Sequence, residues 1–107
     1  METIEEALKA IENAQALMVY FYSEECAPCK ALRPKIETFL REEFPRFEKL
    51  YIEGTSAPSL TAHFGVFGFP TILFFFEGKE YRRYGKSVSL NQLGSELERV
   101  YNLVFET

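Results

Sequence analysis

An unbroken apolar run at residues 17–22 constrains the fold of this chain most strongly. The run is rich in aromatic residues, which is typical of a strand that is buried on both faces. Shortly after it, apolar side chains recur at three- and four-residue steps, the spacing of a helix. These side chains are Ala31, Leu32, Ile36, Phe39 and Leu40. A strand that needs cover on both faces and leads into a helix favours an α/β fold.

The two cysteines of the chain, Cys26 and Cys29, lie at this strand-to-helix junction. Pro28 between them suits the first turn of a helix, where a missing N–H costs nothing. At such a junction, free backbone N–H groups and the positive end of the helix dipole point at the first sulfur. They favour its thiolate, which is the nucleophile of disulfide exchange. We therefore expect Cys26 to attack a disulfide and Cys29, one turn inside the helix, to resolve the mixed disulfide.

Two other interpretations of the cysteine pair remain open at this point. Cysteines of intracellular chains are often inert core residues, and others are metal ligands. A zinc site needs about four ligands, and beyond the pair this chain offers only His63 and carboxylates. Two residues between cysteines, beside a strand–helix–strand pattern, favour redox function. We expect no metal and no cofactor.

Length and charge narrow the possible functions. A chain of 107 residues has the size of one domain, residues 1–107, and can fold without disulfide staples. Its net charge of −4 argues against a general binder of nucleic acid or of anionic membranes. The first residues lack the basic and apolar regions of a secretory signal, and no apolar run approaches the roughly 20 residues that span a bilayer. We expect a cytoplasmic protein, where thiols are kept reduced.

Periodicity, capping residues and turn residues predict eight elements in the order αβαβαββα. They are a helix after Thr3 to about residue 13, a strand at 17–22, a helix from 26 to about 41–43, a strand at 47–52, a short helix at 58–64, a strand at 71–76, a strand at 81–84 after a turn at 77–80, and a helix after Ser89. The first two strands run parallel if the helix between them is a crossover. The natural solution is a mixed four-stranded sheet with helices on both faces.

Several motifs lie at characteristic places in this order. They are Cys26-x-Pro28-Cys29-Lys30 at a helix start, Pro34 inside that helix, Gly65-x-x-Gly68-x-Pro70-Thr71, the Gly78 hairpin and the final amphipathic helix. With these motifs the chain resembles the thioredoxin family over nearly its whole length. The resemblance implies a thioredoxin-like fold and thiol–disulfide exchange at the cysteine pair.

The resemblance also implies a mode of substrate capture. In thioredoxin-like proteins the proline matching Pro70 is cis and packs beside the cysteine pair. The backbone of the preceding residue, here Phe69, pairs with an extended substrate peptide, as an added strand would. Phe67, Phe69 and Phe64 then offer an apolar rim. Packing into the interior is the open alternative for these aromatic residues, and it is favoured for Phe64, which falls at a predicted helix.

Acidic residues before the first cysteine are one departure from the family. Typical thioredoxins carry a tryptophan where this chain has Glu25, and Glu24 precedes it. The two carboxylates disfavour the Cys26 thiolate by like-charge repulsion and so oppose the helix dipole. At exposed positions each effect is of order 0.3–1 kcal/mol.

A second departure lies on the strand that leads to the cysteines. The family places there a buried aspartate that assists proton transfer at the second cysteine, and this chain has Tyr20. A phenol with an unperturbed pKa of about 10 is a poor base at neutral pH. Lys49 matches the lysine partner of that aspartate, and it either faces Tyr20 or is a solvated strand lysine. We hypothesise that attack by Cys26 is retained while deprotonation of Cys29 is slower or relies on water.

Two classes of function follow from these residues. The first is a thiol–disulfide oxidoreductase, a cytoplasmic and monomeric protein disulfide reductase that acts on disulfide-containing proteins and is recharged by a reductase partner. The second is a thioredoxin-fold interaction module that binds peptides through Phe67 and Phe69 with little turnover. The cysteine pair favours the first class, whereas Glu25 and Tyr20 keep the second open.

Overall fold

The computed structural model describes residues 3–106, and its elements follow the predicted order αβαβαββα. They are α1 (Ile4–Asn13), β1 (Ala16–Tyr22), α2 (Ala27–Glu43), β2 (Glu48–Glu53), α3 (Pro58–His63), β3 (Thr71–Phe76), β4 (Lys79–Tyr84) and α4 (Leu90–Phe105). Local signals begin the helices, because Thr3 and Glu6 form the predicted capping box of α1 and Ser89 accepts the Gln92 N–H at the start of α4. The helices within residues 3–106 all fall short of the length and hydrophobicity that a membrane span requires.

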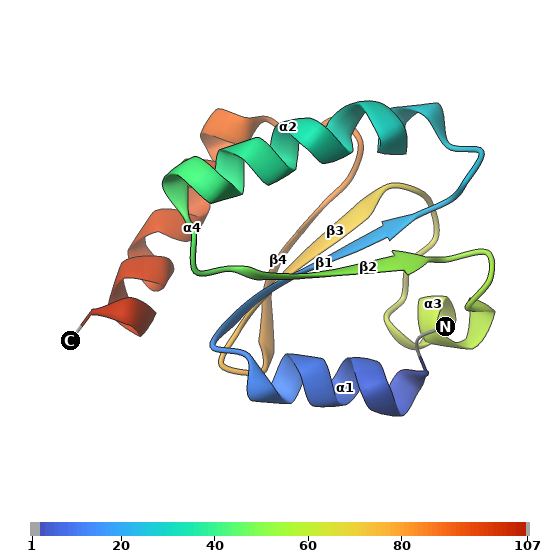
Figure 1. The fold of residues 1–107 in the computed structure, drawn as a ribbon, viewed down its shortest axis with the longest axis horizontal. Coiled ribbons are helices and arrows are strands. Elements are labelled where there is room, and N and C mark those ends of the chain that lie inside the picture. The colour runs from blue at the N-terminus through green and yellow to red at the C-terminus, as the bar shows by residue number, and fades with distance from the viewer. Residues whose placement is uncertain (1–2, 107) are drawn as a thin grey trace.

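The four strands form one mixed sheet in the order β2-β1-β3-β4. Strand β1 pairs in parallel with β2 and antiparallel with β3, and β3 pairs antiparallel with β4. Helices α2 and α4 cover one face of the sheet, and α1 and α3 lie on the other (Figure 1). The two central strands are therefore buried on both faces, as their unbroken apolar sequences predict.

The hairpin between β3 and β4 is tighter than predicted. Only Glu77 and Gly78 form the turn, so β4 begins at Lys79 rather than at Tyr81. Both turn residues have positive φ angles, of 50° and 83°. A two-residue turn with this backbone matches the twist of the flanking strands, and glycine adopts it without steric cost. The predicted bounds of the other elements agree with the structure to within one or two residues.

Alternate side chains of β1 point into two separate cores. Met18 and Tyr20 belong to the core beneath α2 and α4, whereas Leu17, Val19 and Phe21 belong to the core above α1 and α3. All five side chains are at most 2 % exposed. The strand that leads to the cysteines is thus fixed by packing on both of its faces.

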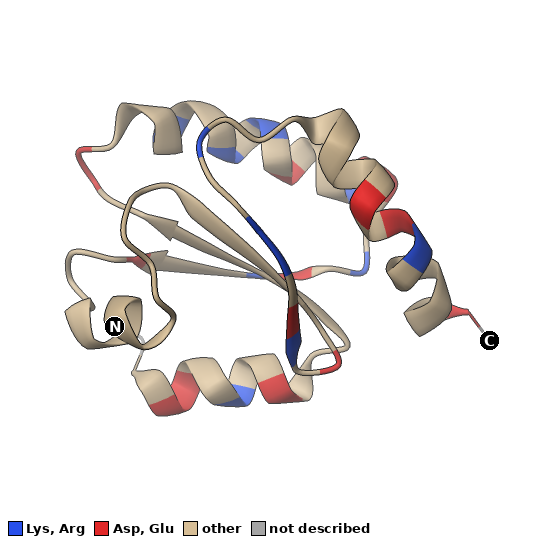
Figure 2. Cartoon of the chain, turned by 180° about the vertical axis from the view of Figure 1, so that it is seen from behind, with Lys and Arg blue, Asp and Glu red and all other residues tan. Residues whose placement is uncertain are grey.

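Charged side chains lie on the helices and on the outer strands, and Figure 2 shows a basic run along β4. The exposed residues of β4 are Lys79, Glu80, Arg82 and Arg83. On the opposite edge strand, β2, Glu48 and Lys49 are exposed. Charges on edge strands disfavour pairing with another sheet, because a partner strand would have to desolvate them.

An aromatic cluster around Phe47 supplies much of the core beneath α2 and α4. The Phe47 ring lies 5.3 Å from the ring centroids of both Phe74 and Phe76, and 5.6 Å from that of Tyr101. The Phe47 side chain is 3 % exposed. The cluster thus joins β3 to α4 through the segment that precedes β2.

Replacing Phe47 by alanine should lower the free energy of unfolding by about 3–5 kcal/mol, because it leaves a cavity among these rings. Urea denaturation of the oxidised protein measures the change. The matched control is Phe67→Ala, since Phe67 is 98 % exposed and its removal should cost close to nothing. Equal unfolding midpoints for the two variants would contradict this description of the core.

Candidate active site

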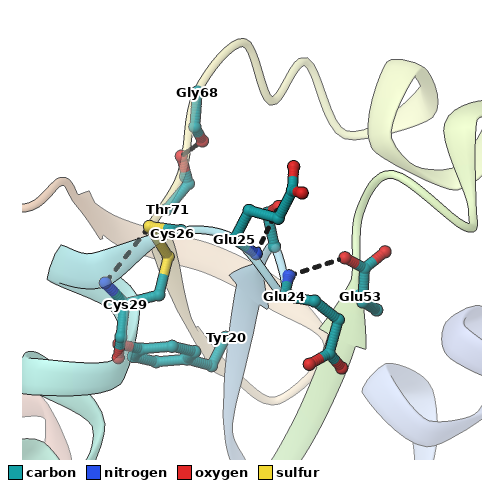
Figure 3. The surroundings of a disulfide bond; sticks show 9 residues. Tyr20, Glu24, Glu25, Cys26, Cys29, Glu53, Gly68 and Thr71 are labelled. Atoms are coloured by element: carbon teal, nitrogen blue, oxygen red, sulfur yellow. Dashed lines mark hydrogen bonds between the residues drawn. A yellow bond between two sulfur atoms is a disulfide. The ribbon is translucent and has the colours of Figure 1, made fainter.

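Cys26 and Cys29 form a disulfide at the start of α2 (Figure 3). Cys26 is the N-cap residue of the helix, and Pro28 lies in its first turn. The backbone N–H of Cys29 donates a hydrogen bond to the Cys26 sulfur at 3.1 Å. The predicted arrangement, in which free N–H groups of a helix start point at the first sulfur, is therefore present. It stabilises negative charge on the Cys26 sulfur in the reduced protein.

The two cysteines differ in exposure. Cys26 is half-buried and is reached from solvent, whereas Cys29 is 1 % exposed and belongs to the core beneath α2 and α4. A partner molecule can therefore reach the Cys26 sulfur, and the Cys29 sulfur lies behind it. The difference supports different tasks for the two sulfurs in one exchange reaction.

The segment that leads into β3 lies beside the disulfide, and Figure 3 shows Gly68 from this segment and Thr71, the first residue of β3, there. The peptide bond between Phe69 and Pro70 is cis, and Pro70 is buried. The Thr71 hydroxyl donates a hydrogen bond to the Gly68 carbonyl at 2.6 Å and so closes the loop. The structure thus brings the cysteine pair and the proline loop together, although about 40 residues separate them in the sequence.

The three phenylalanines predicted as an apolar rim have different surroundings. Phe67 is 98 % exposed, so its whole ring is available to a partner. Phe69 is half-buried and its ring packs directly on the backbone of Gly54, which follows β2. Phe64 packs against Phe21 and Phe75, with ring centroids 6.0 and 6.3 Å away. Phe64 therefore belongs with the interior packing, the alternative that its place at a helix favoured.

Tyr20 is fully buried and its hydroxyl donates a hydrogen bond to the Cys29 carbonyl at 2.8 Å. Burial raises the pKa of Tyr20 to about 12, against the opposing effect of the Arg33 charge. The phenol is therefore neutral at physiological pH and cannot accept a proton there. In place of the family's aspartate, this chain has a hydrogen-bond donor that fixes the backbone at the second cysteine.

Tyr51, rather than Lys49, lies beside Tyr20. In the parallel pairing of β1 with β2, Tyr20 is opposite Tyr51 and Met18 is opposite Lys49. The rings of the two tyrosines are 5.9 Å apart. Lys49 is exposed, as the solvated alternative for this residue requires.

Arg33, Glu37 and Tyr51, which we call the Arg33 cluster, were not singled out from the sequence. The Arg33 guanidinium lies 3.7 Å from the centroid of the Tyr51 ring and forms an ion pair of 3.2 Å with Glu37. The Tyr51 hydroxyl donates a short hydrogen bond to the same Glu37 oxygen. The hydrogen bonds from Tyr51 and Arg33 hold the pKa of Glu37 below its usual value. The spacing of Arg33 and Glu37 by four residues on a helix was the available sequence signal.

Acidic residues border the other side of the site, before Cys26. Glu24 and Glu25 are exposed in the turn after β1. The Glu24 backbone N–H donates a hydrogen bond to the Glu53 carboxylate at 2.9 Å, which ties this turn to the end of β2 (Figure 3). The hydroxyl of Thr55 and the Glu24 N–H lower the pKa of Glu53 to about 2. Glu53 is thus an anion at all physiological pH values.

Within residues 3–106, no group of three or more His, Cys, Asp and Glu side chains is arranged to hold a metal ion. His63 is exposed on α3 and its ring lies edge-on to Phe64, 4.9 Å away. The sulfur atoms of the pair are bonded to each other. The chemistry that these residues support is therefore exchange between thiols and disulfides.

Comparisons with known proteins agree with this geometry. The family model described as Thioredoxin matches residues 2–99. The chain is 31 % identical to the Thioredoxin-like protein YdfQ of Bacillus subtilis, over 87 % of this chain and 82 % of YdfQ. It is 34 % identical to the chloroplastic Thioredoxin X of Arabidopsis thaliana over 65 % of this chain, but spans only 38 % of that longer protein.

Among solved structures, the oxidised form of mitochondrial Thioredoxin 3 from Saccharomyces cerevisiae superposes with a TM-score of 0.78. The alignment covers 90 % of this chain and 89 % of the yeast chain, at 18 % identity. At this identity the superposition establishes the shared fold, a four-stranded sheet between helices.

Replacing Gly54 by alanine should destabilise the protein by about 1–3 kcal/mol, because an added Cβ collides with the Phe69 ring at a buried position. Urea denaturation measures the change. Gly68→Ala is the matched control, since a Cβ added at Gly68 meets no atom within 4 Å. If the two alanine variants unfold at the same urea concentration, Phe69 does not pack on Gly54 in solution.

Proposed function

This chain belongs to the thioredoxin family and carries the cysteine pair of a thiol–disulfide oxidoreductase, and from this premise we propose that it reduces disulfides in other proteins through Cys26 and Cys29. The family match and the similarity to thioredoxins support the activity. The observation that carries the proposed roles is the contrast between a half-exposed Cys26 sulfur, which accepts the Cys29 N–H, and a buried Cys29.

The reaction begins with the reduced protein. The Cys26 thiolate attacks one sulfur of the substrate disulfide, so that a mixed disulfide forms and one substrate thiolate leaves. Cys29 then loses its proton and attacks the Cys26 sulfur, which breaks the mixed disulfide and releases the second substrate thiolate. The substrate gains two electrons and two protons as thiols, and the protein keeps the Cys26–Cys29 disulfide. A dithiol-reducing partner returns the protein to its reduced state.

Substrate binding involves Phe69, Pro70 and Phe67. The backbone of Phe69 before the cis bond pairs with an extended segment of the substrate, and Phe67 supplies exposed apolar surface beside it. Because Phe69 itself is half-buried against Gly54, its side chain positions the loop more than it contacts the substrate.

Four further residues modulate the site. Pro28 fixes the first turn of α2 between the sulfurs, and Glu25 places a negative charge beside Cys26. Tyr20 holds the Cys29 carbonyl without serving as a base. Lys49 contributes positive charge at the edge of the Arg33 cluster, where it helps to lower the pKa of Glu37 after the larger effects of the Tyr51 and Arg33 hydrogen bonds.

The cellular setting follows from the same chemistry. A disulfide reductase works where thiols are kept reduced, so we place the protein in the cytoplasm, with disulfide-containing proteins as substrates and a reductase as electron donor. We propose that residues 1–107 act as one domain and as a monomer, because charged edge strands oppose sheet-to-sheet association. The net charge of −4 supports neither nucleic acid nor an anionic membrane as a partner.

Replacing each cysteine by serine tests which sulfur attacks and which resolves. Cys29→Ser should accumulate a covalent complex with a protein disulfide substrate, because the mixed disulfide cannot be resolved, whereas Cys26→Ser should form none and lose turnover. Non-reducing electrophoresis and mass spectrometry after incubation with a model protein disulfide measure both outcomes. Recovery of the complex from Cys26→Ser instead would reverse the assignment. If the wild-type protein does not reduce the model protein disulfide, the result would support the interaction-module alternative, which the matched relatives do not favour.

Replacing Tyr20 by aspartate should speed resolution of the mixed disulfide near neutral pH. A buried carboxylate has a raised pKa and can accept the Cys29 proton, which a phenol with a pKa of about 12 cannot do. Single-turnover kinetics between pH 6 and 9 measure the rate of resolution. Tyr20→Phe is the control, because it removes the hydroxyl without adding a base. Unchanged rates for Tyr20→Asp across this range would show that Tyr20 does not limit the step.

A further inference from the structure

We propose that Arg33 is a positioning residue for the resolving step, in which its guanidinium charge favours the Cys29 thiolate that attacks the mixed disulfide. The inference rests on the proposed function, because it takes Cys29 as the resolving cysteine. It identifies how this chain promotes loss of the Cys29 proton although no carboxylate occupies the position of Tyr20.

A small pocket joins Arg33 to the second cysteine. The pocket has a volume of about 180 Å³ and is lined by Cys29 and Arg33 together with Tyr20, Lys30 and Glu24 among others. Arg33 follows Cys29 by four residues on α2, which places the two side chains on the same side of the helix, one turn apart. A cation on α2 and the second cysteine thus line the same pocket.

The Arg33 side chain is held in place from two directions. Its guanidinium stacks on the Tyr51 ring at 3.7 Å, and the Tyr22 ring centroid lies 6.0 Å away. Its Nε atom forms the 3.2 Å ion pair with Glu37, and the same Glu37 oxygen accepts the Tyr51 hydroxyl. A guanidinium fixed in this way keeps its charge at one place, which a freely rotating lysine does not.

On the side of Cys29, the positive charge of Arg33 lies closer along the helix than the negative charge of Glu37. Glu37 lies eight residues after Cys29, a further helical turn away from it than Arg33. At Tyr20, whose hydroxyl contacts the Cys29 carbonyl, burial raises the pKa most, and the Arg33 charge lowers it more than the Glu37 charge raises it. At Tyr20, beside the Cys29 backbone, the charge of Arg33 therefore has the larger effect of the two.

Other titratable groups lie on several of the elements that pack around Cys29. They are Tyr20 and Tyr22 on β1, Glu24 and Glu25 in the turn, Lys30 on α2, Lys49, Tyr51 and Glu53 on β2, Tyr84 on β4 and Glu96 on α4. Residues 65–76, which include β3, carry no titratable side chain. Tyr20 is neutral, and Glu24 and Lys30 are exposed, so solvent screens their charges. Arg33 is the one half-buried cation that lines the pocket within the described residues.

The chemical step is the second half of the exchange. Cys29 releases its proton to water, and its thiolate attacks the Cys26 sulfur of the mixed disulfide. The new Cys26–Cys29 bond forms, and the bond from Cys26 to the substrate sulfur breaks with both electrons leaving on the substrate. A nearby guanidinium lowers the pKa of the attacking thiol, and it thereby raises the thiolate fraction at neutral pH.

Stopped-flow reaction of the reduced protein with one equivalent of 2,2′-dithiodipyridine separates the two halves. This uncharged disulfide releases one pyridinethione when Cys26 attacks and a second when Cys29 resolves the mixed disulfide, so both phases are observed by absorbance. In Arg33→Gln, the second phase should slow by about two- to fivefold at neutral pH, the range that half-exposed charges produce. Above the midpoint of the pH profile it should equal or exceed the wild-type rate, because a thiolate of higher pKa is the better nucleophile.

Two variants control for charge and for structure. Lys35→Gln removes the same charge from an exposed position of α2 outside the pocket, and its second phase should match the wild type. Arg33→Lys keeps the charge but not its fixed position, and it should restore part of the rate at neutral pH. An unchanged rate of the first phase in Arg33→Gln shows that the surroundings of Cys26 are intact, since this rate depends on the reactivity of the Cys26 thiolate.

The outcomes separate this inference from the proposed function. If Arg33→Gln has the wild-type pH profile, or is slower by the same factor at every pH, the inference about Arg33 is wrong. It is also wrong if Arg33→Lys behaves like Arg33→Gln. The proposed roles of the cysteines require that the wild type shows a second phase and that Cys29→Ser abolishes it. If either result is absent, these roles are wrong, whatever the Arg33 variants show.

Discussion

Burial of β1 on both faces is the constraint on which the site depends. Met18 and Tyr20 pack beneath α2 and α4, and Val19 and Phe21 pack above α1 and α3, so the strand can neither rotate nor slide by one residue. The end of this strand is where α2 begins, with Cys26 as its N-cap. Core packing therefore determines where the cysteine sulfurs lie relative to the proline loop, which enters from β3, the neighbouring strand.

Tyr20 links this core to the chemistry. An aspartate at a position that is 0 % exposed requires a compensating partner, because burial of a charge is costly. A tyrosine instead adds a large apolar ring to the core and satisfies its single hydroxyl with the Cys29 carbonyl. The strand is thus fully packed at this position and the backbone of the second cysteine is held by a hydrogen bond, but the position offers no buried base.

The sequence predicted features that depend on neighbouring residues. The helix starts, Pro28 in the first turn, the two doubly buried strands and the order of elements all follow from local signals, and the resemblance added the proline loop. The Arg33 cluster was not predicted, because it depends on which β2 residue lies opposite Tyr20, and a shift of two residues would exchange Tyr51 for Lys49. The predicted hairpin turn was two residues too long, because Glu77 adopts a positive φ that its residue type does not favour.

The two sulfurs lie in different electrostatic surroundings, and the difference acts on separate steps. Glu25 and Glu53 lie on the side of Cys26, where they oppose the stabilisation that the helix start gives its thiolate. Arg33 lines a pocket with Cys29, where in our proposal it favours the second thiolate. In the reduction potential, which compares both thiols with the disulfide, these effects partly cancel. In the rates of the proposed mechanism they do not, because attack depends on the first sulfur and resolution on the second. If the proposed roles hold, such a site lowers the reactivity of the exposed cysteine while it limits the time that a mixed disulfide persists.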